Sequence, residues 1–202
     1  MARIGIYAGT FNPVHAGHIT FALQAVEAAE LDELYFLPER QPRSKKGVEH
    51  FGHRVAMLRR AAAPHPKFEI LELEDVNFSV KQTLPRLRKR FPGDQLVFLF
   101  GSDAISHLLD WPLIDRLLAG NELVIGVREE GSQEELKATI SKWPVRPPVV
   151  TLFPSYAPAV SSGKIRSAMR RGRQTAGLLK SVERYSDQHW LYVSLSQTVD
   201  KP

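Results

Sequence analysis

The sequence predicts an α/β fold in which a parallel β-sheet carries helices on both of its faces. Short apolar runs alternate with stretches of helical spacing along almost the whole chain of 202 residues. Such alternation is typical of parallel sheets built from strand–helix–strand units. Several of the runs, Leu96–Phe100 among them, are apolar throughout rather than at every second residue. Strands of that kind are buried on both sides, so we expect helices above and below the sheet.

Six strands are expected, each from an apolar run flanked by polar or turn-forming residues. The run Arg3–Ala8 ends at Gly9, and the run Glu33–Leu37 is stopped by Pro38. The later strands are expected at Phe68–Leu73, Leu96–Phe100, Glu122–Val127 and Val149–Phe153.

Helices are expected between these strands and after the last one. Apolar residues at helical spacing predict the first helix over His18–Glu30. Ser79 is expected to cap a helix over Ser79–Arg90, and Pro112 to occupy the first turn of a helix over Pro112–Leu118. The remaining helices are expected at Phe51–Ala63, Gln133–Lys142 and Ser162–Arg171.

The length fits one domain, residues 1–202, with a disordered tail at residues 199–202. Cysteine is absent, which excludes disulfides, thiolate metal sites and cysteine nucleophiles. No apolar run reaches the roughly 20 residues of a membrane helix, and the N-terminus lacks the apolar stretch of a signal peptide. We therefore expect a soluble, cytoplasmic protein without a membrane partner; the oligomeric state stays open, a homo-oligomer included.

The basic character of the chain favours a polyanionic ligand. The formal net charge is +5 and the sequence pI about 9.6, which suits nucleoside triphosphates and nucleic acid alike. Aromatic residues are not interleaved with cations, as they are in single-strand-binding platforms. We therefore expect no specific nucleic-acid partner, although a nucleotide- or nucleic-acid-binding module without catalysis remains an alternative. The long polar and basic stretch Pro38–Gly47 predicts a mobile loop over the site.

The densest motif is the ten-residue run Gly9–His18, which joins the first strand to the first helix. The carboxyl ends of parallel strands and the start of a helix form a natural anion site. Gly9 and Gly17 allow close approach to the backbone, and His15 and His18, three residues apart, can face one point. The alternatives are surface or capping histidines, or a zinc site, for which no third ligand is placed nearby.

Other elements of the sequence offer a second anion site and groups for a nucleoside. Ser161 and Ser162 precede the last predicted helix, with Lys164 and Arg166 close to its start. Taken alone, this is equally an ordinary capped helix with surface cations. Asp103, after Gly101 at the end of a strand, is either a ribose ligand or a helix cap, and Trp111 either stacks on a ligand or belongs to the core.

The run Gly-Thr-Phe-Asn-Pro-x-His-x-Gly-His resembles the signature of the nucleotidylyltransferase superfamily, and its Asn-Pro form most resembles nicotinate-nucleotide adenylyltransferases. The resemblance extends from Ile4 to Tyr192. Further segments that carry it are Phe36–Pro38 with His53–Leu58, Phe78–Leu84, Phe98–Asp103 with Trp111, Val160–Arg166, and Tyr185 with Leu191–Tyr192.

The resemblance implies a Rossmann-like fold of nucleotidylyltransferase type and transfer of AMP from ATP to nicotinate mononucleotide, giving nicotinate adenine dinucleotide and pyrophosphate in NAD biosynthesis. It implies Mg²⁺ held mainly by the triphosphate, with no metal site built from the chain. The implied catalytic residues are His15, His18, Lys164 and Arg166. The implied ATP-binding residues are Gly9, Thr10, Phe11, His15, Gly17, His18, Gly101, Asp103, Ser161, Ser162, Ile165 and Arg166. The implied mononucleotide-binding residues are Phe11, Asn12, Arg43, Lys45, Lys46, Phe78, Ser79, Thr83 and Trp111.

The sequence departs from the family pattern in two places. Gln41–Lys46 stands where the family usually has Pro-Pro-His-Lys, and Gly163 replaces the usual Thr. The first departure affects contacts to the mononucleotide, and the second removes a hydroxyl from the phosphate clamp. Alternatives within the superfamily are a nicotinamide-mononucleotide adenylyltransferase, a phosphopantetheine adenylyltransferase and a cytidylyltransferase.

Overall fold

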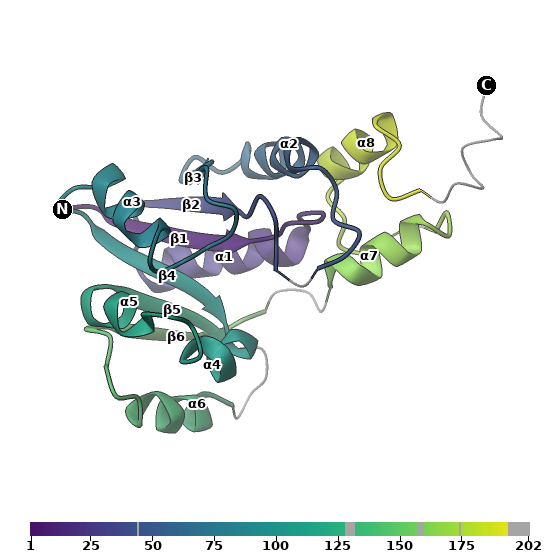
Figure 1. Ribbon diagram of the computed structural model, residues 1–202. Coiled ribbons are helices and arrows are strands. Elements are labelled where there is room, and N and C mark those ends of the chain that lie inside the picture. The colour runs from purple at the N-terminus through teal and green to yellow at the C-terminus, as the bar shows by residue number, and fades with distance from the viewer. Residues whose placement is uncertain (44, 128–131, 157–159, 174, 194–202) are drawn as a thin grey trace.

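The sheet of the computed structural model has six parallel strands in the order β3-β2-β1-β4-β5-β6 (Figure 1). The structure describes residues 1–43, 45–127, 132–156, 160–173 and 175–193. The chain runs outward from β1 to β3 and then returns to add β4 on the other side of β1. The carboxyl ends of β1 and β4 therefore flank the point where the strand order reverses, which is where open α/β sheets bind ligands. The strands are β1 (Arg3–Gly9), β2 (Glu33–Pro38), β3 (Phe68–Ile70), β4 (Gln95–Gly101), β5 (Glu122–Val127) and β6 (Val150–Pro154).

Helices pack on both faces of this sheet, as predicted. One hydrophobic core takes buried side chains from α1 (Ala16–Ala28), α2 (Phe51–Ala62) and α8 (Lys180–Gln188). The second takes them from α3 (Thr83–Arg90), α4 (Ser102–Leu108), α5 (Ile114–Gly120) and α6 (Ser132–Ser141). The strand β4 supplies both cores, Val97 and Leu99 to the first and Leu96 and Phe98 to the second. That is why its sequence is apolar throughout.

The predicted α/β class and all of the predicted strands are confirmed, with shifts at some ends. The third strand stops at Ile70 instead of Leu73, and the last runs over Val150–Pro154 instead of Val149–Phe153. Two helices, α4 and α8, were not predicted. The predicted tail, residues 199–202, lies outside the described part of the chain.

Several predicted helix starts are wrong. The first helix begins at Ala16 rather than His18, and α5 begins at Ile114 rather than Pro112. The predicted cap at Ser79 is wrong because α3 begins only at Thr83. Before α3, the Ser79 N–H donates to Oγ1 of Thr83 at 3.0 Å. Residues 79–82 therefore form a separate turn and not the first turn of the helix. Pro85 thereby falls in the first turn of α3, where a missing N–H costs nothing.

The remaining predicted helix ends move by one or two residues. The second helix ends at Ala62, α6 runs from Ser132 to Ser141, and α7 (Ser162–Met169) ends before Arg171. Among the described helices, none is long and apolar enough to cross a membrane.

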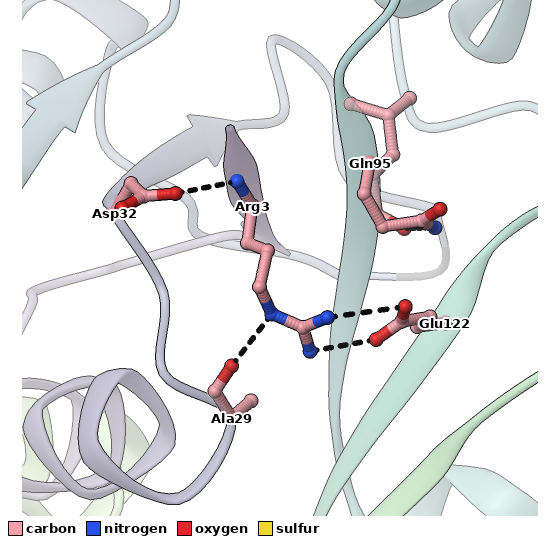
Figure 2. A network of polar contacts seen from close by, with 6 residues as sticks. Arg3, Ala29, Asp32, Gln95 and Glu122 are labelled. Carbon is pink, nitrogen blue, oxygen red and sulfur yellow. Dashed lines mark hydrogen bonds and ion pairs between the residues drawn. The ribbon is translucent and has the colours of Figure 1, made fainter. Parts of the chain in front are cut away.

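A polar network joins the strands at the edge of the sheet opposite the carboxyl ends (Figure 2). The guanidinium of Arg3, in β1, donates to both carboxylate oxygens of Glu122, in β5, at 3.2 and 2.7 Å. Its Nε donates to the carbonyl of Ala29 beyond α1, and its backbone N–H to Asp32. This arrangement fixes the amino ends of the strands and leaves the carboxyl ends for the site.

Candidate active site

A cavity of about 1070 Å³ opens at the carboxyl ends of β1 and β4. Its lining comes from the loop after β1, the starts of α1 and α7, the loop after β2 and the end of β4. These segments are remote in sequence and meet because the strand order reverses here. Its volume lies at the upper end of the range of small-molecule sites, about 300–1,000 Å³.

His15 and His18 lie together at the start of α1. His15 is the N-cap residue, and its backbone N–H donates to Nδ1 of His18 at 3.2 Å. The two ring centroids are 3.8 Å apart, and both rings line the cavity. Because Nδ1 of His18 accepts this hydrogen bond, the neutral ring carries its proton on Nε2 and can donate it to a ligand.

The N-terminus of α7 is joined to the loop after β1. The Ser162 hydroxyl donates to the carbonyl of Pro13 at 2.9 Å, and the Arg166 guanidinium donates to the carbonyl of Asn12 at 2.7 Å. The Ser161 hydroxyl caps the helix by accepting from the Lys164 N–H at 3.2 Å. The helix thus presents N–H groups, two hydroxyls and two cations to the cavity, beside the histidine pair.

Lysines reach the cavity from the loop after β2. Nζ of Lys45 donates to Oγ1 of Thr10 at 2.8 Å, and both Lys45 and Lys46 line the cavity. Arg43 lies elsewhere: its guanidinium donates to Oδ1 of Asn77 at 3.1 and 2.8 Å, and the residue does not line the cavity. Cations from two segments, the loop after β2 and the start of α7, therefore line the same cavity as the histidine pair.

Comparison with known proteins agrees with this geometry. The family model described as Cytidylyltransferase-like matches residues 6–168. The nicotinate-nucleotide adenylyltransferase of Bacillus subtilis is 34% identical over 203 residues, which cover 96% of this chain and 100% of that protein. The "Probable nicotinate-nucleotide adenylyltransferase" of Geobacillus kaustophilus is 33% identical, over 100% of this chain and 91% of that protein.

The chain belongs to the nicotinate-nucleotide adenylyltransferase family. It is accordingly a nucleotidyltransferase. The solved structure of Plasmodium falciparum nicotinic acid mononucleotide adenylyltransferase complexed with NaAD superimposes with a TM-score of 0.79 at 19% identity. That superposition covers 95% of this chain and 98% of the other, and it confirms the fold.

Nucleotidyltransferases of this family typically use a divalent metal. Within the part of the chain that the structure describes, no three His, Cys, Asp or Glu side chains come together as a metal site.

The family's aromatic positions form one end of the cavity. The ring of Trp111 packs against Phe78, with 5.7 Å between centroids, and against Phe100, at 6.0 Å. Trp111 is half-buried: it packs against the second core and also lines the cavity. Gly101, the N-cap of α4, and Asp103, in its first turn, line the neighbouring wall.

Three other residues implied by the family resemblance are buried, and one of them, Phe11, also lines the cavity. Thr83 is buried with 1% exposure, and its hydroxyl accepts from the Ser79 N–H. Ile165 is buried with 1% exposure and does not line the cavity. Phe11 is buried, yet lines the cavity and packs at 5.2 Å from the His18 ring. Its ring lies over Gly9, where a Cβ would come within 2.9 Å of it, so only glycine fits there.

Two supporting residues lie in segments that resemble the family, but the sequence assigns a role to neither of them. Arg54 is fully buried, and its guanidinium donates to the carbonyls of Thr10, Arg40 and Glu49 at 2.7, 2.9 and 3.0 Å. It thereby ties the loop after β1 to the loop after β2. Burial lowers the pKa of Arg54, and the three carbonyls compensate for its lost hydration. On the sequence alone, an arginine in an amphipathic helix is a surface residue.

The other is Tyr192, which lies beyond the residues that the family model matches. It is 4% exposed, and its hydroxyl donates to Oδ1 of Asn12 at 2.8 Å. Burial raises the pKa of Tyr192, so it keeps its proton at neutral pH. Oδ1 of Asn12 also accepts from the Glu49 N–H at 3.2 Å, and its Nδ2 donates to the Gly47 carbonyl at 3.3 Å. Asn12, expected to bind the mononucleotide, thus has its side chain engaged with the protein itself.

Proposed function

We propose that this protein transfers the adenylyl group of ATP to the 5′-phosphate of nicotinate mononucleotide, giving nicotinate adenine dinucleotide and pyrophosphate. The reaction is a step of NAD biosynthesis. One observation carries the proposal: the His15–His18 pair lines one cavity together with the N-terminus of α7 and the lysines of the loop after β2. Two phosphate groups that must react with each other require cations that offset their repulsion.

The two sides of the cavity match two different ligands. The hydroxyls of Ser161 and Ser162, the helix N-terminus and the cations Lys164 and Arg166 suit a triphosphate. Lys45 and Lys46, followed by an aromatic pair, suit a phosphomonoester that carries a flat ring. We therefore assign ATP to the α7 side and the mononucleotide to the side of the loop after β2.

The chemistry needs positioning and charge neutralisation more than a base. The acceptor phosphate has its second pKa near 6, so at pH 7 it is mostly a dianion and attacks without losing a proton to the protein. An oxygen of this phosphate forms a bond to the α-phosphorus of ATP while the bond from that phosphorus to the bridging oxygen breaks. The bridging oxygen leaves with pyrophosphate and its electron pair. The Nε2–H of His18, with His15, Lys164 and Arg166, stabilises the charge on the α-phosphate and the departing oxygens.

ATP is expected to enter as its Mg²⁺ complex, with the ion held by the triphosphate and water. Since the reaction consumes cellular ATP, we propose a cytoplasmic location. The test is pyrophosphate release with ATP and a panel of acceptors: nicotinate mononucleotide, nicotinamide mononucleotide and phosphopantetheine. Turnover with a pyridine mononucleotide supports the proposal, whereas turnover with phosphopantetheine alone, or with CTP in place of ATP, rejects it.

A further inference from the structure

The ring end of the cavity contains a carboxylate, whereas most of the charged side chains that line the site are cations. Glu39 directly follows β2 and lines the cavity together with Phe78 and Trp111. Its Oε1 accepts a hydrogen bond from the Phe78 N–H at 3.2 Å. A flat ring stacked on Phe78 and Trp111 would bring its substituent close to this hydrogen bond. The inference rests on the proposed function, since it takes the ring to be a pyridine.

The backbone of Glu39 is fixed, so only its side chain can respond to a ligand. Its N–H donates to the Gly9 carbonyl at 3.0 Å. The carbonyl of the next residue, Arg40, accepts from the buried Arg54. A ligand that repels the Glu39 carboxylate can therefore displace this carboxylate only by rotating the Glu39 side chain away from Phe78.

The backbone donors that a ring carboxylate would use are already engaged. Glu39 holds the Phe78 N–H, and the hydroxyl of the buried Thr83 holds the Ser79 N–H at 3.0 Å. Behind them lies a second carboxylate, Asp75, but Arg86 pairs with it at 3.2 Å and compensates its charge. Within the described part of the chain, Glu39 forms no direct ion pair. Its charge is only partly compensated, through its electrostatic interaction with the buried Arg54 guanidinium.

We propose that Glu39 determines how well the enzyme distinguishes the acid from the amide form of the pyridine mononucleotide. The acid substituent must displace the Glu39 side chain from the Phe78 N–H and bears a like charge, so Glu39 lowers the use of the acid. The amide can donate its NH₂ to the Glu39 carboxylate where it stands. Glu39 therefore makes the ratio of kcat/KM for the acid to kcat/KM for the amide smaller than it would be without this carboxylate.

The substitution Glu39→Gln tests this directly. Glutamine still accepts from the Phe78 N–H through its amide oxygen, but it removes the charge and offers NH₂ donors to an acid substituent. We expect the ratio of kcat/KM for nicotinate mononucleotide to that for the nicotinamide analogue to rise by about tenfold or more, the size of a charge-assisted hydrogen bond. The KM for ATP should stay unchanged. The matched control is Glu74→Gln, an exposed carboxylate on the segment after β3, which should leave the ratio at the wild-type value.

Two further variants keep the test decisive if the glutamine variant folds poorly. Glu39→Asp retains the charge, so its ratio should stay near that of the wild type, and Glu39→Ala should raise it as glutamine does. An unchanged or lower ratio in both uncharged variants overturns the role of Glu39 while leaving the proposed function intact. If the wild-type protein uses neither pyridine mononucleotide, the proposed function itself has failed, and the inference fails with it.

Discussion

The hydroxyl of Tyr192 donates to Oδ1 of Asn12 across a separation of 180 residues. The contact joins the segment after α8 to the loop after β1, which carries the histidine pair. The same amide side chain binds the backbone of Gly47 and Glu49, in the loop that also brings the lysines to the cavity. One buried side chain therefore connects three segments that must keep their relative positions during the reaction.

Replacing Tyr192 by Phe removes the hydroxyl and keeps the ring. We expect the free energy of unfolding to fall by about 1 kcal/mol, the typical net value of a hydrogen bond. We also expect a higher KM for the mononucleotide and a smaller change in kcat, because the loop with Lys45 and Lys46 loses an anchor. Chemical denaturation and steady-state kinetics measure both effects. Tyr35→Phe, which removes a surface hydrogen bond to Glu33, is the control and should leave KM unaltered.

The same tyrosine makes stability depend on alkaline pH. Its pKa is raised by burial in the folded state, so the folded protein binds the proton more tightly than the unfolded chain does. The resulting stabilisation is complete below the ordinary tyrosine pKa of about 10 and is lost as the pH rises above that value. We expect the unfolding free energy of Tyr192→Phe to fall less steeply above pH 10 than that of the wild type. Parallel slopes would show that the hydroxyl is not protected in the folded state. Burial also raises the pKa of Tyr35, to about 12, but Tyr35 adds the same pH dependence to the wild type and to Tyr192→Phe.

The sequence predicted the residues that line the cavity better than the residues that hold them in place. His15, His18, Ser162 and Arg166 lie in short motifs at strand and helix ends, where local chain geometry fixes the direction of the side chain. A local pattern is sufficient there, because parallel topology brings all carboxyl ends of the strands to one edge.

Long-range contacts are the part that the sequence could not reveal. The role of Arg54 depends on carbonyls 5, 14 and 44 residues away, and that of Tyr192 on a residue 180 positions away. Both residues lie in segments that resemble the family, but no local pattern specifies these contacts. The helices α4 and α8 are short, and their stability comes from packing on the sheet and on α2 rather than from helix propensity. The family resemblance places Arg43 at the mononucleotide, but Asn77 holds it outside the cavity.

Trp111 tests the assignment of the ring end. Its replacement by Ala removes a stacking surface worth about 1–3 kcal/mol, so kcat/KM for the mononucleotide should fall by roughly 5- to 150-fold. The KM for ATP should change much less. The ring also packs on Phe78 and Phe100, so a modest loss of stability is expected and should be measured in parallel. Trp190→Ala, at a position 48% exposed, serves as the control. An equal loss for both substrates would contradict a ring site at Trp111.

The network of Arg3 and Glu122 should contribute to stability alone. The Glu122 side chain is 10% exposed and binds Arg3 through both oxygens. In Glu122→Gln the partly buried guanidinium loses its charged partner, which should cost about 1–3 kcal/mol of unfolding free energy. The network lies at the amino ends of the strands, so kcat and both KM values should stay at wild-type levels (Figure 2). A change in KM would mean that this edge of the sheet is coupled to the cavity.

His18 is the residue whose replacement should affect the reaction most. It is half-buried at the start of α1, and its ring touches His15 and Phe11 at the cavity rather than filling the core. The variant His18→Ala should therefore remain folded, with a thermal midpoint close to that of the wild type. The variant loses the Nε2–H donor. In the wild type, Nδ1 of His18 accepts from the His15 N–H, which leaves the proton on Nε2 and directs it toward the phosphates.

Because this donor is fixed before the reaction begins, it stabilises the charge that develops on the α-phosphate without reorganising. Loss of one such donor lowers kcat by about 10²–10³ in comparable sites. The measurement is kcat and KM for both substrates, with His107→Ala, whose side chain is 80% exposed on α4, as the control. A loss confined to the KM for ATP would mean that the contact is equally strong in the ground state and contributes nothing to the chemical step. A kcat near that of the wild type in a folded His18→Ala protein would show that another group stabilises the developing charge in place of His18. His15 is the nearest such group.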